Sequence, residues 1–387
     1  MSKSVCINIT KGQLTGRHLE LDEGEIKMLS PGEYILYLGV DFENVISFNP
    51  QKTMQDLRNK LEILSSSPLL QADQKFCILN TSICPTLIYP FQTVPQHLIP
   101  HGFLIDADKM IRCTLKEVLQ RPSDLPDNMI YSHCKFKGLG LFRSQWEAQL
   151  QQINSLRILH QHSNPYITAT RDVVTESVNC LYKLQIKPDN SFLSPKDGFL
   201  DPRKIRNFLR DMEYNKCCEL PTKEKGIIFF QEYPPINKLI NRHVGLSISE
   251  WRDGIKMIGN VTAVRATPGR TMATNHCRHC HNEIETLSHV LGSCPHGETL
   301  RNAKHHKIRS SIAKALRHSG FKVYEEVHGL STCGSSRRID MIAFNNNKMG
   351  YIIDPTVRFE KSKNQPDDVN NEKKQIYEPT IQYILIY

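Results

Sequence analysis

The chain has 387 residues, of which 39% are hydrophobic and 23% are charged, an ordinary globular composition for two or three domains. It contains no signal peptide and no apolar run of about 18 residues that would span a membrane. The sequence therefore predicts a soluble intracellular protein with no membrane partner. The net charge of +9 is mild over this length, so its distribution along the chain is more informative than its sum.

The first part of the chain predicts short strands followed by helices. Residues 1–48 alternate short apolar runs with turn residues, which favours strands and turns. Thr53 is expected to cap the first helix, and Pro68 to open a second one. Further helices are predicted over 106–120 and 145–160 from their apolar periodicity. The block is therefore mostly helical, with a small strand element in front.

The region that follows, residues 163–270, alternates short apolar runs with polar and Pro-containing stretches. This pattern predicts a helical linker. The region contains no internal repeat and no low-complexity tract.

The most specific motif is Cys277-x2-Cys280-x8-His289-x4-Cys294. Two thiolates separated by two residues can point both sulfurs at one ion, and a histidine and a third cysteine complete a closed tetrahedral shell. Intracellular cysteines in such spacing favour a metal over disulfides. The sequence therefore predicts a structural Zn²⁺ site; the alternative is scattered buried cysteines and a surface histidine.

A basic segment follows the cysteines at once. Residues 301–322 contain seven Lys or Arg side chains and no acid, and a field of that sign suits a phosphate backbone. Helical periodicity places Ile308, Ile312, Ala315 and Leu316 on one side and most of the basic residues opposite. The alternative is a solvated helix face, with His305 capping the helix instead of contacting phosphate. The residues expected to bind nucleic acid are Arg301, Lys304, His305, Lys307, Lys314 and Arg317.

The rest of the chain predicts a second metal site. The expected order is a helix over 301–318, strands over 321–327, 338–344 and 351–359, and a helix over 366–378. Asp340 and Asp354 would then lie on neighbouring strands and share one Mg²⁺, which prefers oxygen ligands. Lys373 is the candidate to orient the attacking water or stabilise the phosphate. The alternative is that Asp340 and Asp354 are ordinary strand-end carboxylates and Lys373 is a surface lysine. Three further acids could also serve the metal site, and the sequence does not rank them: Glu325, Glu326 and Glu360.

These residues together resemble a known family. The chain looks like the C-terminal portion of the polyprotein of a non-LTR retrotransposon of the ribosomal-DNA-targeting type, with a reverse transcriptase, a CCHC zinc knuckle and a restriction-like endonuclease. Residues 37–42 resemble the primer grip of the polymerase palm, and 115–126 with Gly138-Leu139-Gly140 resemble the thumb. Lys137 replaces the first of two adjacent glycines that the family usually has. Residues 264–270 look like the end of the linker before the knuckle.

The knuckle and nuclease carry the specific part of the resemblance. The CCHC pattern matches the family's knuckle, and Lys304-His305 resembles the basic motif that opens its nuclease. Asp340 stands where the family has Pro-Asp, with the proline lost, and Asp354 matches the second carboxylate. Lys373 and Tyr377 resemble the Lys-x3-Tyr step that follows, so the resemblance implies that Asp340, Asp354, Lys373 and Tyr377 are catalytic.

The resemblance implies an α+β multidomain fold. The expected segments are a palm end over 1–48, a helical thumb over 49–162, a helical linker over 163–272, the knuckle over 273–298 and a C-terminal α/β restriction-endonuclease-like domain over 299–387.

Two departures from the family bear on function. No Tyr/Phe-x-Asp-Asp occurs in the sequence, so the chain is expected to begin after the polymerase catalytic centre and not to polymerise. The C-terminus is expected to be truncated within the nuclease domain, which would leave an open sheet edge and favour self-association.

Three functions follow as hypotheses. The first is a Mg²⁺-dependent endonuclease in the nucleus that nicks target DNA, so that the new 3′-hydroxyl primes reverse transcription of the element RNA. The second is a binding module without catalysis, whose affinity for RNA or DNA falls steeply with salt. The third is a decayed element fragment without a selected role. The Asp340→Ala variant separates the first two, because it would remove cleavage and leave binding.

Overall fold

A computed structural model describes residues 48–120, 125–161, 173–219, 245–267, 274–345, 349–359 and 364–381, with eight short strands between Val5 and Phe42. This part of the chain is α+β and mostly helical. It divides into two compact units: Met1–Cys217 with Pro234–Lys256, and Cys218–Tyr233 with Met257–Tyr387. The five narrower segments expected from the sequence stay a prediction. None of the described helices has both the length and the apolar character needed to cross a membrane.

The N-terminal strands are short and pair locally. They are β1 (Val5–Cys6), β2 (Ile9–Thr10), β3 (Gln13–Leu14), β4 (Glu20–Leu21), β5 (Gly24–Glu25), β6 (Lys27–Met28), β7 (Ile35–Tyr37) and β8 (Val40–Phe42). β1 pairs with β6 in parallel, and the other three pairs are antiparallel between consecutive strands. The expected strand element is therefore confirmed. Of the residues likened to a primer grip, Tyr37 lies opposite Val40, and Leu38 and Gly39 lie outside the described residues.

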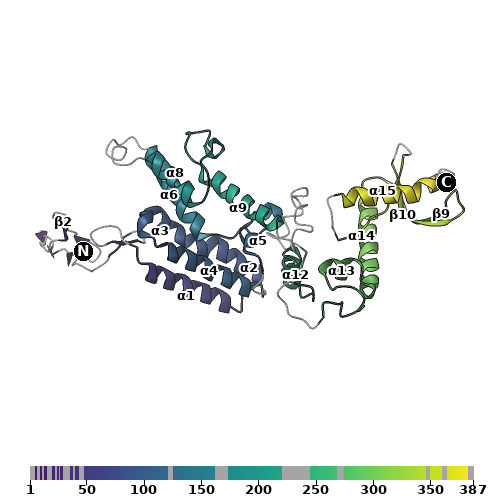
Figure 1. Ribbon diagram of the computed structural model, residues 1–387, viewed down its shortest axis with the longest axis horizontal. Coiled ribbons are helices and arrows are strands. Elements are labelled where there is room, and N and C mark those ends of the chain that lie inside the picture. Colours follow the sequence, from purple (N-terminus) through teal and green to yellow (C-terminus); the bar gives the residue numbers. More distant parts are fainter. Residues whose placement is uncertain are drawn as a thin grey trace. The chain divides into compact units, whose positions relative to one another are not determined.

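Helices make up the rest of the first unit (Figure 1). They are α1 (Pro50–Ser66), α2 (Ala72–Ile78), α3 (Ile88–Thr93), α4 (His101–Val118), α5 (Asp127–Tyr131), α6 (Ser144–His160), α8 (Val173–Lys183), α9 (Pro202–Cys218) and α12 (Ile248–Ile258). α4 packs on α1, and α6 packs on α3, α4 and α8. Leu79, Ile111, Leu115 and Leu150 are fully buried in this core, and each contributes about 1.5–3 kcal/mol by leaving water.

Three helix starts differ from the sequence prediction, and one of them is that of α4, which begins at His101 and not at residue 106. α1 begins at Pro50, because the Asn49 side chain accepts a hydrogen bond from the Lys52 backbone N–H at 2.9 Å and caps the helix. The prediction that Thr53 caps this helix is wrong, because the Thr53 hydroxyl donates to the Asn49 carbonyl from inside the first turn. The second helix begins at Ala72 and not at Pro68.

The connection before α6 explains the residues likened to a thumb glycine motif. Lys137 has φ 59°, a left-handed conformation that glycine adopts more readily than lysine. A side chain at Gly138 would overlap the Ser132 carbonyl, and one at Gly140 would approach Cys134 Sγ to 2.7 Å. Lys137 therefore holds a backbone conformation that glycine adopts more readily, while Gly138 and Gly140 lie where a side chain would collide.

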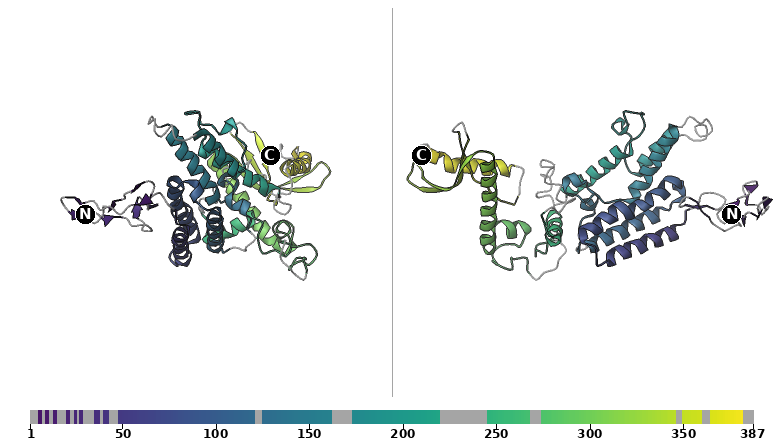
Figure 2. Two further views of the ribbon diagram at one scale, coloured as in Figure 1. Left: turned by 60° about the vertical axis from the view of Figure 1, so that its left-hand side comes forward. Right: turned by 180° about the vertical axis from the view of Figure 1, so that it is seen from behind.

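The second unit combines a small helix, two longer helices and a sheet (Figures 1 and 2). Its elements are α13 (Leu287–Gly292), α14 (Glu298–His318), β9 (Lys322–Leu330), β10 (Ser336–Phe344), β11 (Gly350–Ile353) and α15 (Gln365–Tyr377). The strands form an antiparallel sheet in the order β11-β10-β9. Ile339, Ile342 and Tyr377 form a buried cluster that joins the sheet to α15.

Three details of this unit correct the sequence prediction. The third strand ends at Ile353 and does not continue to residue 359. α14 begins at Glu298, three residues earlier than expected. Ala315, expected on the buried side of that helix, is exposed, and the buried side chains are Arg309 and Ala313. β9 and β11 are the outer strands of the described sheet; association of two chains through such an edge stays a prediction.

Candidate functional site

The four predicted zinc ligands converge. The ligand atoms of Cys277, Cys280, His289 and Cys294 all lie within 4.8 Å of one another. Cys277 Sγ is 3.8 Å from Cys294 Sγ, and Cys280 Sγ is 3.3 Å from His289 Nε2. A tetrahedral ion with Zn–S bonds of about 2.3 Å places two sulfurs about 3.8 Å apart. The donor set and its spacing therefore fit a closed structural Zn²⁺ site.

Local backbone structure positions these ligands. The Cys277 N–H donates to the Glu283 carbonyl at 2.7 Å, which closes a tight loop around Cys280. The backbone N–H of Cys280 is the main cause that lowers the pKa of the Cys277 thiol to about 6, which favours the thiolate that binds metal. Thr286 caps α13 by accepting a hydrogen bond from the His289 N–H, so the helix starts where its histidine faces the sulfurs.

Glu283 is a supporting residue that the sequence pattern did not single out. Its carboxylate lies 2.7 Å from His289 Nδ1, so it can accept that ring proton and leave Nε2 for the metal. Its side chain is 61% exposed. The imidazole is buried, and the exposed Glu283 carboxylate orients it from the surface.

Replacing Glu283 by alanine is expected to weaken zinc binding by about 10–100-fold, because the imidazole loses the partner that fixes its orientation and tautomer. Competition for zinc with a chromophoric chelator measures this effect. Asn282→Ala, an exposed neighbouring change, is the matched control. Equal zinc affinities of the two variants would contradict the role of Glu283.

Glu285 links the knuckle to the segment before it. Its buried carboxylate accepts hydrogen bonds from the Arg278 guanidinium and from the backbone N–H groups of Arg278 and Arg265. Arg278 lowers the pKa of Glu285 to about 2, and its guanidinium also donates to the Ala263 carbonyl at 2.7 Å. Residues 263–265 are thereby attached to the knuckle. Of the residues likened to the end of a linker, 268–270 lie outside the described part of the chain.

The second candidate centre lies beside the middle of β10, where β11 ends. Met341 pairs with Ile353 across these antiparallel strands, so Asp340 and Asp354 are the next opposing positions of the ladder. The two carboxyl groups lie close enough for each to shift the pKa of the other. The side chains are 17% and 9% exposed, respectively. The expected proximity of the two carboxylates is present, although Asp354 follows the last residue of its strand.

α15 delivers the other two predicted residues to the same place. Lys373 Nζ lies 2.7 Å from Asp354 Oδ2, and the Tyr377 hydroxyl donates to the same oxygen. The two side chains are four residues apart and therefore lie on one face of the helix. A pocket of about 500 Å³, also lined by Ile352 and Val369, opens against Asp354, Lys373 and Tyr377.

The two carboxyl groups differ in their tendency to ionise. Burial raises the pKa of Asp340, and the adjacent charge of Asp354 raises it further. Burial also disfavours ionised Asp354, but the hydrogen bonds from Lys373 and Tyr377 outweigh burial and leave its pKa lowered. Two adjacent carboxylates repel each other when both are ionised. A divalent cation between them would remove that repulsion.

α14 contributes a fifth side chain to this cluster. His305 Nε2 lies 3.0 Å from Asp340 Oδ2, so His305 contacts a carboxylate of the candidate centre. Glu325 and Glu326 have partners elsewhere: Arg309 and Arg317 pair with Glu325, and Arg309 pairs with Glu326. Glu360 lies outside the described residues.

The remaining basic residues of α14 separate into two groups. Arg301 donates to the Cys294 carbonyl at 2.8 Å, and Arg317 pairs with Glu325 at 2.8 Å, so both hold the unit together. Lys304, Lys307 and Lys314 are exposed and make no ion pair within the described part of the chain. Their spacing places them along one side of the helix, opposite the buried Arg309 and Ala313.

Comparison with known proteins adds a family resemblance. No family model matches the chain. It is 24% identical over 350 residues to the retrovirus-related Pol polyprotein from type-1 retrotransposable element R2 of Popillia japonica, covering 87% of this chain and 66% of that protein. It is also 24% identical over 344 residues to the Pol polyprotein from type-2 retrotransposable element R2DM of Drosophila melanogaster. This match covers 88% of this chain and 31% of that protein.

A third relative, the Pol polyprotein from type-1 retrotransposable element R2 of Nasonia vitripennis, is 24% identical over 323 residues, covering 82% of this chain and 29% of its own. The chain thus spans less than two thirds of the length of each of these three relatives. The resemblance inferred from the motifs is confirmed: over more than four fifths of its length, the chain is similar to Pol polyproteins of R2-type non-LTR retrotransposons.

Proposed function

We propose that the second unit is a Mg²⁺-dependent DNA endonuclease. The observation that carries this proposal is the convergence of Asp340 from the middle of β10, Asp354 from the end of β11, and Lys373 and Tyr377 from α15. Asp340 and Asp354 would hold the ion. When bound, Mg²⁺ would supply a water activated for attack and neutralise charge on the phosphate being cut.

The side chains around the carboxylates have distinct roles in this proposal. Lys373 reaches Asp354 from α15, so its ammonium is within reach of a phosphate or water at that carboxylate. Tyr377 fixes the Asp354 oxygen that Lys373 also contacts. His305 holds the Asp340 carboxyl from the other side, which orients it toward Asp354.

DNA would be bound by the same unit. Lys304 and Lys314 are ten residues apart, about 15 Å along α14, and with Lys307 they form a basic stripe. Arg301 connects α14 to the knuckle through the Cys294 carbonyl, so zinc would keep the start of the stripe ordered. This binding is proposed to weaken with salt, because it rests on phosphate contacts.

Similarity to R2 Pol polyproteins suggests the biological use of the nick. We propose that it supplies the 3′-hydroxyl for target-primed reverse transcription, with target DNA and element RNA as partners in the nucleus.

Nicking of supercoiled plasmid by the purified zinc-loaded chain tests the function directly. Open-circular product is expected with Mg²⁺, none with chelator, and none from Asp340→Ala at equal zinc content. DNA binding by Asp340→Ala is expected to stay within about twofold of the parent chain, because Lys304, Lys307 and Lys314 are unchanged. Cleavage by Asp340→Ala at the parental rate would rule out this centre.

A binding module without catalysis is the second candidate. One observation favours it: Asp354 already has Lys373 and Tyr377 as partners, so the cluster is partly neutralised without an ion. This candidate, which includes a decayed fragment that has kept its binding residues, predicts salt-sensitive DNA binding and no Mg²⁺-dependent nicking by the parent chain.

A further inference from the structure

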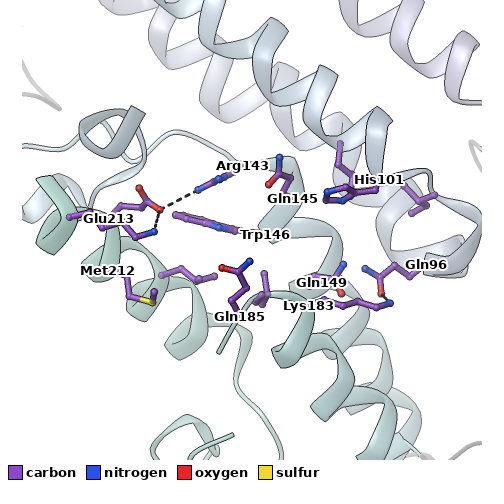
Figure 3. A pocket seen from close by; sticks show the side chains of 15 residues that line it. Gln96, His101, Arg143, Gln145, Trp146, Gln149, Lys183, Gln185, Met212 and Glu213 are labelled. Atoms are coloured by element: carbon purple, nitrogen blue, oxygen red, sulfur yellow. Dashed lines mark hydrogen bonds and ion pairs between the residues drawn. The ribbon is translucent and has the colours of Figure 1, made fainter. Parts of the chain in front are cut away.

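The central charged and aromatic side chains in a pocket of the first unit compensate one another. This pocket has a volume of about 520 Å³ and is lined by α4, α6, α9 and the end of α8. Figure 3 shows Glu213 against Arg143, at 3.3 Å. The Arg143 guanidinium lies 4.9 Å from the centroid of the Trp146 ring, which is only 7% exposed. Less compensated charge lies in the second unit, on the hairpin formed by β9 and β10.

The outer part of this hairpin, residues 327–339, is basic and is called the distal hairpin below. It contains Arg337, Arg338 and His328 and no acid, and it contains no Phe, Tyr or Trp. Arg338 lies directly opposite His328 in the strand ladder, and both side chains are exposed. The side chains of the distal hairpin are therefore positive or neutral, which suits a phosphate backbone.

One face of the distal hairpin is covered. The Thr332 N–H donates to the Pro379 carbonyl at 3.1 Å. Thr380 packs so closely on Gly329 that a Cβ at Gly329 would lie 2.8 Å from the Thr380 methyl carbon. Thr380 and Ser331 are both buried. The residues that follow α15 therefore hold this face of the hairpin (Figure 1).

The opposite face is exposed. Successive side chains of a strand point to opposite faces, so residues 328 and 330 point away from the face that Gly329 presents to Thr380. Their partners on β10 are residues 338 and 336. The four exposed side chains of this face are His328, Leu330, Ser336 and Arg338. The distal hairpin thus has a fixed back and an exposed front that carries a cation.

The exposed face leads to the candidate metal centre. Arg338 and Asp340 are two residues apart on β10, so their side chains lie on the same side of the strand. Asp340 is the carboxylate that contacts His305 of α14. The strand from residue 336 to residue 340 is about 13 Å long, which is close to the length of about four base pairs of DNA. DNA with a phosphate at Asp340 could therefore run along this face.

Arg338 can exchange its partner at low cost. Its guanidinium lies 2.6 Å from the Glu326 carboxylate, and the two side chains are 52% and 39% exposed. Exposed ion pairs of this kind contribute little to stability. Glu326 also has a second cation, Arg309 of α14, at 2.5 Å, and that side chain is only 10% exposed. A phosphate could therefore take Arg338 without leaving the Glu326 carboxylate unpaired.

We propose that the exposed face of the distal hairpin binds duplex DNA beside the phosphate to be cut, with Arg338 on a backbone phosphate. This inference rests on the proposed nuclease for the position of the cut. A two-stranded ribbon fits the major groove of B-DNA. Unpaired bases are bound by stacking on aromatic rings, which the distal hairpin lacks. The hairpin is therefore suited to a duplex and not to a single strand.

The salt dependence of duplex binding tests the Arg338 contact. Fluorescence anisotropy of a short labelled DNA duplex with the zinc-loaded full chain, without Mg²⁺, gives log Kd against log salt concentration. Arg338→Gln is expected to lower the slope by about 0.9, the value for one phosphate contact, and to weaken binding roughly five- to tenfold at about 0.1 M salt. Arg338→Lys keeps the charge and is expected to keep the slope.

Arg358→Gln is the matched control. Arg358 is 48% exposed and pairs with Glu372 at 3.3 Å, so the variant also removes an exposed, paired arginine of the second unit, outside the hairpin. Its slope is expected to equal that of the parent chain. Equal slopes of Arg338→Gln and Arg358→Gln would overturn the proposal, whether or not the parent chain nicks plasmid.

A photo-crosslinker on Cys333 locates the DNA independently. Cys333 is exposed in the turn of the distal hairpin. The zinc-loaded chain, labelled with a thiol-reactive benzophenone and kept without Mg²⁺, is expected to crosslink to the duplex more than to single-stranded RNA or DNA of the same sequence. The Cys333→Ser chain, treated identically, is expected to lose this product. Equal yields from the two chains, or a single-strand yield as high as that of the duplex, would overturn the proposal. Neither assay needs cleavage, so failure of the nuclease leaves both results readable.

Discussion

Replacing Asp354 by asparagine is expected to lower plasmid nicking by roughly 10³-fold while the unit stays folded. An ion that polarises a phosphate contributes several kcal/mol to the transition state, and about 4 kcal/mol corresponds to a thousandfold in rate. The amide keeps the shape of the carboxyl group and an oxygen for Lys373 and Tyr377, but loses the charge that binds the cation. The loss should therefore appear in catalysis and not in folding.

Single-turnover nicking at saturating DNA and a range of Mg²⁺ concentrations measures this effect. Asp367→Asn, an exposed aspartate in the first turn of α15, makes the same chemical change away from the cluster and is expected to nick at the parental rate. The melting temperature of both variants checks folding. Nicking by Asp354→Asn within tenfold of the Asp367→Asn rate would show that Asp354 is not an ion ligand.

The sequence predicted those parts of the second unit that depend on local spacing. The x2 interval of Cys277 and Cys280 defines a turn by itself, and the alternation of apolar residues marks the strands that bring Asp340 and Asp354 into register. Lys373 and Tyr377 needed only helical spacing to share a face. Each of these inferences uses geometry within one element or between adjacent strands, which sequence periodicity specifies.

Other features depended on packing that the sequence pattern does not contain. Arg309 is buried because Glu325 and Glu326 on the adjacent strand pair with it, and this rotates α14 so that Ala315 faces solvent. His305 meets Asp340 for the same reason. The start of α1 depended on which of two nearby polar residues caps it, and Asn49 takes that position because its backbone is extended there.

The Cys280→Ser variant is expected to lose zinc and the ordered knuckle together. Structural zinc contributes about 10–16 kcal/mol to the folding of small zinc modules, and a serine hydroxyl is a poor ligand at neutral pH. The three remaining donors leave the coordination shell open, so zinc affinity should fall by at least about 10³-fold. Residues 274–294 have few other sources of stability, because Cys277, Glu285, Leu287, His289 and Cys294 are their only buried side chains.

Zinc content after dialysis against a moderate chelator, with amide hydrogen exchange, separates this outcome from general unfolding. Protection of the Cys277 and Cys294 N–H groups, which donate to Glu283 and His289, should disappear, while that of the α4 and α6 amides in the first unit should persist. Cys333→Ser changes an exposed cysteine of the second unit outside the cluster and is expected to retain one zinc per chain. Equal zinc content in the two serine variants would show that Cys280 is not a ligand. Loss of zinc without loss of protection at Cys277 and Cys294 would show that the metal does not hold the knuckle's fold. The stability of the knuckle would then rest on the Arg278–Glu285 ion pair and on its backbone hydrogen bonds alone.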